Sequence, residues 1–273
     1  MPWTFTDDVD AFLDAAGASL AARPAENTLI LTVTETLRRH GPHAYGDAAP
    51  LLGWWRGADG EVAGTLVQTP PYPPMLGSVD PAAVGPLAAA LPLTRINADR
   101  AAAERIAATW PGHRVDQEQR LYRLATLIPP SPAPAGRPRA AVVADRELLV
   151  RWVRDFADGT GQPGTHAERL VDERIASGGL TLWEDDGVPV SMAGVSPRIA
   201  GMVRVAAVYT PPEHRGRGYA AGVTAEISRA ARQAGAQEVL LFTDLANPTS
   251  NGVYRRIGYR PVSDRLLIST AEQ

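Results

Sequence analysis

The chain has 273 residues, of which 45% are hydrophobic and 21% are charged, and its formal net charge is −3. This composition is typical of one or two globular domains and excludes a disordered or fibrous chain and a polybasic coat for nucleic acid. The chain has no cysteine, which excludes disulfides, thiolate metal sites and a cysteine nucleophile.

No stretch approaches the roughly 18 consecutive apolar residues of a membrane-spanning helix. The first eight residues are acidic where a secretory signal peptide would be basic. We therefore expect a cytoplasmic protein that does not engage a membrane. All 27 basic residues are arginine, which excludes the chemistry of a Schiff-base lysine or a P-loop lysine.

Hydrophobic periodicity and turn residues predict helices and strands in the first half of the chain. The helices are expected at 8–22, 26–40, 81–91 and 98–110, and the strands at 51–56, 61–68 and 117–128. Residues 129–139 follow, where the density of proline forbids a helix and removes the donors of a central strand. We expect this segment to be a semi-rigid linker between two domains.

The second half alternates between strand and helix patterns. Helices are expected at 145–157, 165–177, 217–234 and 248–257, and strands at 180–185, 188–196, 202–210, 238–244 and from 259 onwards. This alternation predicts a mixed α/β layer.

The two halves contain a similar short pattern. Residues 52–56 followed by 60–64 resemble residues 180–184 followed by 187–194, and both look like β-hairpins that end in Ala-Gly. Either two aromatic hairpins are alike by chance, or the chain holds two copies of one fold. The first hairpin continues into the proline-rich residues 69–74 instead of a glycine-arginine loop, so the first copy would be degenerate.

One segment of the second half predicts an anion site. Residues 203–210 are a largely apolar strand, which the residues Pro-Pro-Glu-His at 211–214 break. The glycine-rich turn 215–220 then opens an amphipathic helix, so backbone N–H groups and the positive end of the helix dipole converge. A phosphate or pyrophosphate is the natural ligand, and Walker and Rossmann fingerprints are absent. The alternative is a bare turn that contains glycine.

Two ordered motifs resemble the GCN5-related N-acetyltransferase (GNAT) family. The turn Arg-Gly-Arg-Gly-Tyr-Ala at 215–220 matches the Arg/Gln-x-x-Gly-x-Gly/Ala pattern of the family's acetyl-CoA loop. The segment 239–259 is similar to the family's strand followed by its Asn, small residue, Tyr and Gly-aromatic series. The resemblance covers roughly 140–270. It implies the acyl-CoA N-acyltransferase fold, an α/β fold with a mixed, mostly antiparallel sheet flanked by helices.

Together with the repeated hairpin, the resemblance implies two tandem GNAT-like domains. Residues 1–128 would be the degenerate domain, 129–139 the linker and 140–273 the catalytic domain. The implied cofactor is acetyl-CoA or another short acyl-CoA.

The resemblance also implies cofactor contacts. Backbone groups of Val208, Tyr209 and Thr210 would pair with the pantetheine arm as an added strand. The pyrophosphate would be held by Arg215 and by the N–H groups of Gly216, Arg217, Gly218, Tyr219, Ala220 and Ala221. Asn247 and Asn251 could bond to the cofactor from the other side, although Asn247 could equally be only the N-cap of the following helix.

Tyr254 is the implied catalytic residue, because its phenol can protonate the thiolate that leaves the thioester. The alternative is an ordinary half-buried aromatic residue. Asp244, Glu213 and His214 are the candidate bases, and a backbone carbonyl with an ordered water is a further option. A weak base suffices for an α-amine, because deprotonating it at pH 7 costs only about 1–1.5 kcal/mol.

We therefore expect an N-acetyltransferase that moves an acetyl group to a primary amine of a small molecule, by direct attack without a covalent enzyme intermediate. The alternatives are a non-catalytic acetyl-CoA sensor and an interaction protein that binds no nucleotide. The five histidines show no metal-ligand spacing, so no metal is expected. Nucleic acid is not an expected partner, and a homodimer is compatible with the sequence.

Overall fold

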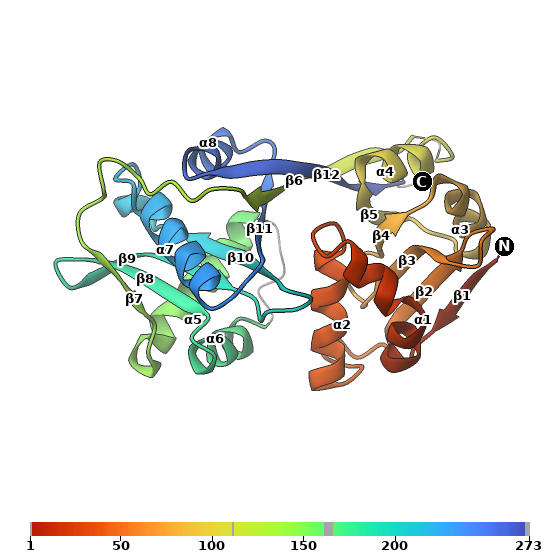
Figure 1. Cartoon of the computed structure of the whole chain (residues 1–273), viewed down its shortest axis with the longest axis horizontal. Coiled ribbons are helices and arrows are strands. Elements are labelled where there is room, and N and C mark those ends of the chain that lie inside the picture. Colours follow the sequence, from red (N-terminus) through yellow and green to blue (C-terminus); the bar gives the residue numbers. More distant parts are fainter. Residues whose placement is uncertain (1, 111, 161–165, 271–273) are drawn as a thin grey trace. The chain divides into compact units, whose positions relative to one another are not determined.

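In a computed structural model of the chain, residues 2–110, 112–160 and 166–270 are described (Figure 1). The residues form two compact units. The N-terminal unit consists of Met1–Leu121, Asp244–Ala246 and Val262–Gln273, and the C-terminal unit consists of Tyr122–Thr243 and Asn247–Pro261. This division differs from the expected contiguous domains 1–128 and 140–273, because the chain passes between the units more than once.

The N-terminal unit is an α/β layer. Its elements are β1 (Trp3–Thr6), α1 (Val9–Ala22), α2 (Thr28–His40), β2 (Leu51–Arg56), β3 (Val62–Gln68), β4 (Met75–Val79), α3 (Val84–Ala90), β5 (Arg95–Asp99), α4 (Arg100–Ala107) and most of β6 (Arg114–Leu124). The strand order is β1-β2-β3-β4-β5-β12, where β12 is Tyr259–Ser269. The β4–β5 pair is parallel, and the neighbouring pairs of this unit are antiparallel.

The C-terminal unit is also an α/β layer. Its elements are β7 (Arg137–Ala140), α5 (Arg146–Thr160), α6 (Ala167–Ala176), β8 (Leu180–Asp185), β9 (Val188–Val195), β10 (Met202–Tyr209), α7 (Tyr219–Gln233), β11 (Glu238–Asp244) and α8 (Pro248–Arg256). The strand order is β6-β11-β10-β9-β8-β7. The β10–β11 pair is parallel, whereas β7, β8, β9 and β10 pair antiparallel in succession.

Helices cover both faces of the C-terminal sheet. Val223, Ile227 and Ala231 recur every four residues along α7 and pack with Val203 and Val205 of β10 on one face. The other face packs against α5 and α6, through a separate apolar cluster that includes Ala207 of β10. The sheet is therefore buried on both sides, with β10 at the boundary of both clusters.

The element order of the first half repeats in the second half. The run β2-β3-β4-α3-β5-α4-β6 corresponds in order to β8-β9-β10-α7-β11-α8-β12. Both predicted hairpins form as antiparallel pairs. The repeated sequence pattern therefore reflects a repeated arrangement of elements.

The last strand of the second run completes the N-terminal unit. Strand β12 pairs with β5 of the N-terminal unit, with Arg265 opposite Asp99. Buried Arg265 donates to Asn97 Oδ1 over 2.8 Å and to the carbonyl of Leu76 over 2.8 Å. Leu266 and Ile268 lie in the N-terminal core. The N-terminal unit is thus completed by residues from the end of β12.

The predicted fold class is confirmed, whereas several element boundaries were wrong. Strands β1, β4, β5 and β7 were not predicted. The expected linker 129–139 ends at Gly136, because residues 137–140 pair with β8. The expected helix 98–110 is shortened to Arg100–Ala107, and the expected strand 117–128 is Arg114–Leu124. No helix among the described residues is long and apolar enough to cross a bilayer.

Candidate functional site

The parallel strands β10 and β11 pair only over part of their length. Partners run from Met202 opposite Glu238 to Val205 opposite Leu241. Strand β10 then continues to Tyr209 and β11 continues to Asp244, but no residues of the two strands pair beyond Val205 and Leu241. Both strands are described in full. Their facing backbone edges beyond this point are therefore open to an extended ligand that adds main-chain hydrogen bonds.

A bulge in β10 lies directly after the last β10–β11 pair. On the β9 side, Ala206 opposes Gly194 and Tyr209 opposes Met192, so β10 holds one extra residue. Ala207 has a φ of +50°, which is unusual for a residue with a side chain. The extra residue turns the backbone of β10 away from regular pairing, which the sequence did not predict.

The residues predicted to contact the pantetheine arm, 208–210, lie at the end of β10. The hydroxyl of Ser191 donates to the carbonyl of Tyr209 over 3.0 Å and lies 2.9 Å from the hydroxyl of Thr210. The Tyr209 ring packs against Trp152, and its hydroxyl donates to Asp155 over 3.4 Å. Burial and the Asp155 carboxylate raise the pKa of the Tyr209 phenol. These contacts fix the strand end from which the glycine-rich turn begins.

The glycine-rich turn adopts the conformation that its sequence predicted. Gly216 has a φ of +78° and Gly218 a φ of +84°, in the left-handed region that other residues rarely adopt. Arg215 Nε donates to the carbonyl of Thr210 over 3.0 Å, so this arginine closes its own turn. The turn residues 215–218 are exposed.

Helix α7 starts with backbone donors that lack an intrahelical acceptor. Its first i→i−4 bond runs from Gly222 N to the carbonyl of Gly218, over 3.0 Å. The N–H groups of Tyr219, Ala220 and Ala221 precede that bond. Gly218 is the N-cap and has no side chain to satisfy them. The first turn of α7 therefore offers N–H groups and the positive end of the helix dipole to an anion.

Tyr219 fixes this helix terminus to the β8–β9 hairpin. Its ring is 3% exposed, and its hydroxyl donates to the Asp185 carboxylate. That hydrogen bond raises the pKa of the Tyr219 phenol, while the guanidinium of Arg217 acts in the opposite direction. Tyr219 is thus an anchor whose backbone N–H faces the predicted anion site.

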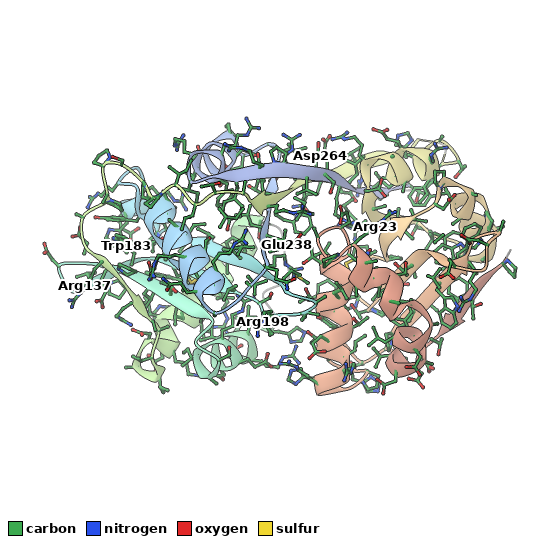
Figure 2. All side chains as sticks on the ribbon, viewed as in Figure 1. Arg23, Arg137, Trp183, Arg198, Glu238 and Asp264 are labelled. Carbon is green, nitrogen blue, oxygen red and sulfur yellow. The ribbon has the colours of Figure 1, made fainter. Side chains whose placement is uncertain are left out.

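The proline-rich segment supports the same helix terminus. The indole of Trp183 donates to the carbonyl of Ala135 over 2.6 Å. A Cβ added at Gly222 would lie 2.8 Å from Pro134 and 3.0 Å from the Trp183 ring, so α7 packs tightly here. Figure 2 shows Trp183 beside α7. The predicted linker therefore packs against the start of α7 and supports the predicted anion site.

The two predicted asparagines have structural partners. Asn247 Oδ1 accepts from Ser250 N over 2.9 Å, so the N-cap interpretation of this residue is confirmed. Asn251 is 6% exposed, accepts from the Tyr122 hydroxyl over 2.9 Å and donates to the carbonyl of Asn247 over 2.8 Å. Their cofactor contacts stay predictions.

Tyr254 lies in a buried aromatic cluster of the C-terminal unit. Its ring is 8% exposed, 6.1 Å from the Tyr259 ring and 6.5 Å from the Tyr122 ring between centroids. Burial raises the pKa of its phenol to about 12. The phenol therefore stays protonated at neutral pH, which a proton donor requires.

The candidate bases have different surroundings. Asp244 is exposed and accepts from Ala246 N over 2.7 Å, so it caps the loop after β11. It is counted with the N-terminal unit, whereas Tyr254 belongs to the C-terminal unit. Glu213 is exposed, and His214 is half-buried with Nδ1 shielded from solvent. Strand β10 contains no aspartate or glutamate.

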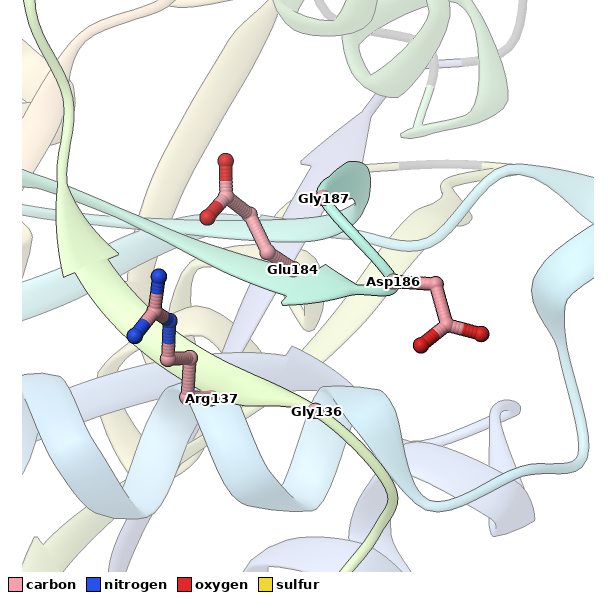
Figure 3. Close-up of a pocket in the computed structure, with 5 residues that line it drawn as sticks. All are labelled: Gly136, Arg137, Glu184, Asp186 and Gly187. Atoms are coloured by element: carbon pink, nitrogen blue, oxygen red, sulfur yellow. The ribbon is translucent and has the colours of Figure 1, made fainter.

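A hollow of about 340 Å³ lies at the β8–β9 hairpin. Figure 3 shows the side chains of the residues that line it. Its lining residues are Gly136, Arg137, Glu184, Asp186 and Gly187. None of the predicted site residues lines it.

The family comparison matches the part of the chain that contains this site. The model of the acetyltransferase (GNAT) family matches residues 147–259. No curated protein matches the sequence. The match includes both motifs on which the resemblance was based.

Solved structures with a similar fold cover most of the chain. A GNAT-family acetyltransferase from Colwellia psychrerythraea is 10% identical, with a TM-score of 0.63 and 98% of each chain covered. A GCN5-related N-acetyltransferase from Sphaerobacter thermophilus is 18% identical, with a TM-score of 0.60, and the alignment covers 97% of this chain and 94% of that chain. One from Kribbella flavida is 21% identical, with a TM-score of 0.51 and coverage of 77% and 87%. The predicted fold is therefore confirmed over both halves.

Proposed function

We propose that the protein is an acetyl-CoA-dependent N-acetyltransferase, because residues 147–259 match the model of the acetyltransferase (GNAT) family. The acceptor is a primary amine of a small molecule. The observation that carries this proposal is the divergence of β10 and β11 directly before a glycine-rich turn at the start of α7. Along the chain, the open backbone edge of β10 is thus followed directly by the predicted anion site at the start of α7.

This order of features fits the chemistry of coenzyme A. The pyrophosphate fits the N–H groups of Tyr219–Ala221, which also lie at the positive end of the α7 dipole. The amides of the pantetheine arm fit the open backbone edge of residues 206–209. Bound acetyl-CoA would supply the acyl group as a thioester.

Tyr254 is the proposed acid. Its phenol is protonated at neutral pH and can donate this proton to the leaving sulfur. Asp244 is the proposed base, and its exposed carboxylate can accept the proton of the attacking amine. Without a cysteine in the chain, we propose direct attack by the amine and no covalent enzyme intermediate.

Release of coenzyme A thiol in a colorimetric assay tests this proposal. Acetyl-CoA is offered with a panel of amines, amino acids, aminoglycosides and peptides. The protein contributes no thiol background, because it has no cysteine. We expect thiol release that requires one class of amine.

Calorimetric binding of acetyl-CoA completes the test. Binding without release across the panel would favour a non-catalytic acetyl-CoA sensor. Absence of both would contradict the cofactor assignment. Mass spectrometry of the acceptor distinguishes transfer to nitrogen from simple hydrolysis of the thioester.

A further inference from the structure

The N-terminal unit repeats the strand geometry of the proposed cofactor site. Strands β4 and β5 pair in parallel at one position only, Met75 opposite Asn97. The pairing of β4 with β3 then shifts, because β4 holds one extra residue between Leu76 and Val79. In the C-terminal unit the last parallel pair likewise precedes a bulge in its first strand, β10. Each unit therefore has two parallel strands that part at a bulge.

The side chain of Arg265, from β12, occupies the opening between β4 and β5. Asn97 N donates to the carbonyl of Pro74 over 2.8 Å, and the carbonyl of Leu76 would be the next acceptor if this parallel ladder continued. That carbonyl accepts from Arg265 Nη2 over 2.8 Å, and the same nitrogen donates to the carbonyl of Asn97 over 3.0 Å. One guanidinium thus bridges the two strands at the place where they part.

This guanidinium is enclosed by the protein. Arg265 is 4% exposed, and it donates hydrogen bonds to neutral oxygen atoms of Leu76 and Asn97. Burial lowers the pKa of its guanidinium to about 10, with Asp99 acting in the opposite direction, so the group stays protonated at neutral pH. A buried charge needs hydrogen bonds that replace water. The carbonyl groups at the parted strands provide them.

A second side chain occupies the bulge of β4. Asn27, the N-cap residue of α2, is 2% exposed, and its Oδ1 accepts from Ser78 N over 2.8 Å. A Cβ added at Gly77 would lie 2.7 Å from this oxygen, so a larger residue there would displace the amide. The backbone N–H group of Ser78, inside the bulge, is therefore taken by a side chain of the same unit.

The connection after β4 offers no place for a phosphate. Only Asp80–Ala83 connect β4 to α3, whereas Thr210–Gly218 connect β10 to α7. The short connection contains no glycine. The Asp80 carboxylate accepts from Ala82 N over 2.7 Å, so the first backbone donors meet a negative charge of the chain itself. That charge would repel a phosphate.

We propose that Arg265, Asn27 and Asp80 occupy, within the N-terminal unit, the places that coenzyme A takes in the C-terminal unit, so that the chain binds one molecule of acyl-CoA. This inference rests on the proposed N-acetyltransferase function, which defines those places. Arg265 and Asn27 replace the amides of the pantetheine arm, and Asp80 replaces a phosphate. The N-terminal unit is thus a copy of the site that the chain itself keeps closed.

The number of acetyl-CoA molecules bound per chain tests the proposal on the intact protein. Equilibrium dialysis with labelled acetyl-CoA is carried to concentrations far above the Kd, so that a weaker second site would also fill. We expect saturation at one molecule per chain, and no second site in Gly218→Asp. Two molecules per chain in the wild-type protein, of which one survives Gly218→Asp, would overturn the proposal.

Chemical rescue tests whether Arg265 acts as an internal ligand. Arg265→Ala should lower the melting temperature, and millimolar ethylguanidinium, which replaces the removed atoms, should restore at least half of the loss. Arg114→Ala is the control, because it removes an exposed arginine that donates to Ser269 Oγ near the end of the same strand. Its loss leaves no enclosed space, so ethylguanidinium should not restore its stability. A folded Arg265→Ala without rescue would overturn the role of Arg265.

The affinity for acetyl-CoA separates a closed copy from a working site. In Arg265→Ala with ethylguanidinium, the Kd should stay within about twofold of the wild-type value, because the two places share no partner. A larger rise would place Arg265 in the working site and overturn the proposal. If the wild-type protein binds no acetyl-CoA, the proposed function fails, and the rescue alone decides whether Arg265 fills the opening. The dialysis of the wild-type protein stays decisive if Arg265→Ala does not fold.

Discussion

At the scale of single residues, burial decides what Tyr254 can do. The pKa of its phenol rises to about 12 because the protein interior disfavours the phenolate. At neutral pH the phenol is protonated, and it is a weaker acid than the phenol of an exposed tyrosine. The proposed role as acid is consistent with that protonation state.

Tyr254→Phe removes the proton and keeps the ring. We expect kcat for acetyl transfer to fall about 100-fold, the typical contribution of a positioned acid, while the Kd of acetyl-CoA changes by less than a few-fold. Tyr259→Phe is the matched control, because Tyr259 packs against Tyr254 and bonds to Ser228. Unchanged kcat in Tyr254→Phe would remove this residue from the mechanism.

The burial of Tyr254 also predicts that the free energy of unfolding falls at alkaline pH. Below pH 10 the phenol of Tyr254 is protonated in both the folded and the unfolded chain, so its contribution does not depend on pH. Between pH 10 and about 12 the unfolded chain loses this proton first, and the free energy of unfolding falls by about 1.4 kcal/mol per pH unit. Urea titrations at several pH values should show a shallower fall in Tyr254→Phe. Equal slopes would contradict the raised pKa.

The residues of the turn and Tyr254 were predicted because both belong to motifs with fixed spacing, and their contacts with the cofactor stay predictions. The bulge of β10 at Ala207 was not predicted. Residues 205–208 are apolar and largely β-branched or small, as in a regular strand. Only the pairing with β9 shows that β10 holds one extra residue.

At the scale of elements, the turn before α7 depends on two glycines with positive φ. Gly218→Asp adds a side chain in the left-handed region, at a cost of about 1–2 kcal/mol, and a negative charge at the phosphate site. We expect the Kd of acetyl-CoA in calorimetry to rise at least 100-fold.

Gly187→Asp is the control for backbone strain. Gly187 has a φ of +78° in the β8–β9 turn, with nothing within 4 Å of an added Cβ. This variant should lose similar stability and keep its affinity for acetyl-CoA. Retained affinity in Gly218→Asp would refute the phosphate assignment, and lost affinity in both variants would attribute the effect to strain.

Long periodic helices and the two hairpins were predictable, whereas several short strands were not. Strand β4 contains a glycine and follows a proline-rich loop, and β5 is a short, largely polar segment before a helix. Strand β7 begins with Arg137-Pro138 and lies at the edge of its sheet, where proline is tolerated. These strands form because a neighbouring strand offers pairing, which local sequence does not encode.

At the scale of the whole molecule, the division of the chain was not predictable from periodicity. The repeated hairpin and the proline-rich segment both predict a boundary near residue 128. The structure instead completes the N-terminal unit with residues 262–270, because Leu266 and Ile268 fill its core.

Fragments test this contribution of β12 to the N-terminal unit. We expect residues 1–128 alone to lack a cooperative thermal transition, because removal of Leu266 and Ile268 alone forgoes roughly 3–6 kcal/mol of apolar burial. Co-expression of residues 1–128 with 129–273 should restore the transition, measured by circular dichroism. A cooperative transition of the isolated fragment 1–128 at the melting temperature of the full chain would contradict this contribution of β12.

The pairing of β5 with β12 has a consequence for synthesis. Asn97 and its partner Arg265 are 168 positions apart, so the ribosome must add that length before the N-terminal sheet can close. At 5–20 residues per second this takes roughly 10–30 s, during which β5 has an unpaired edge. A nascent chain of this protein should therefore require protection from aggregation until its second half has emerged.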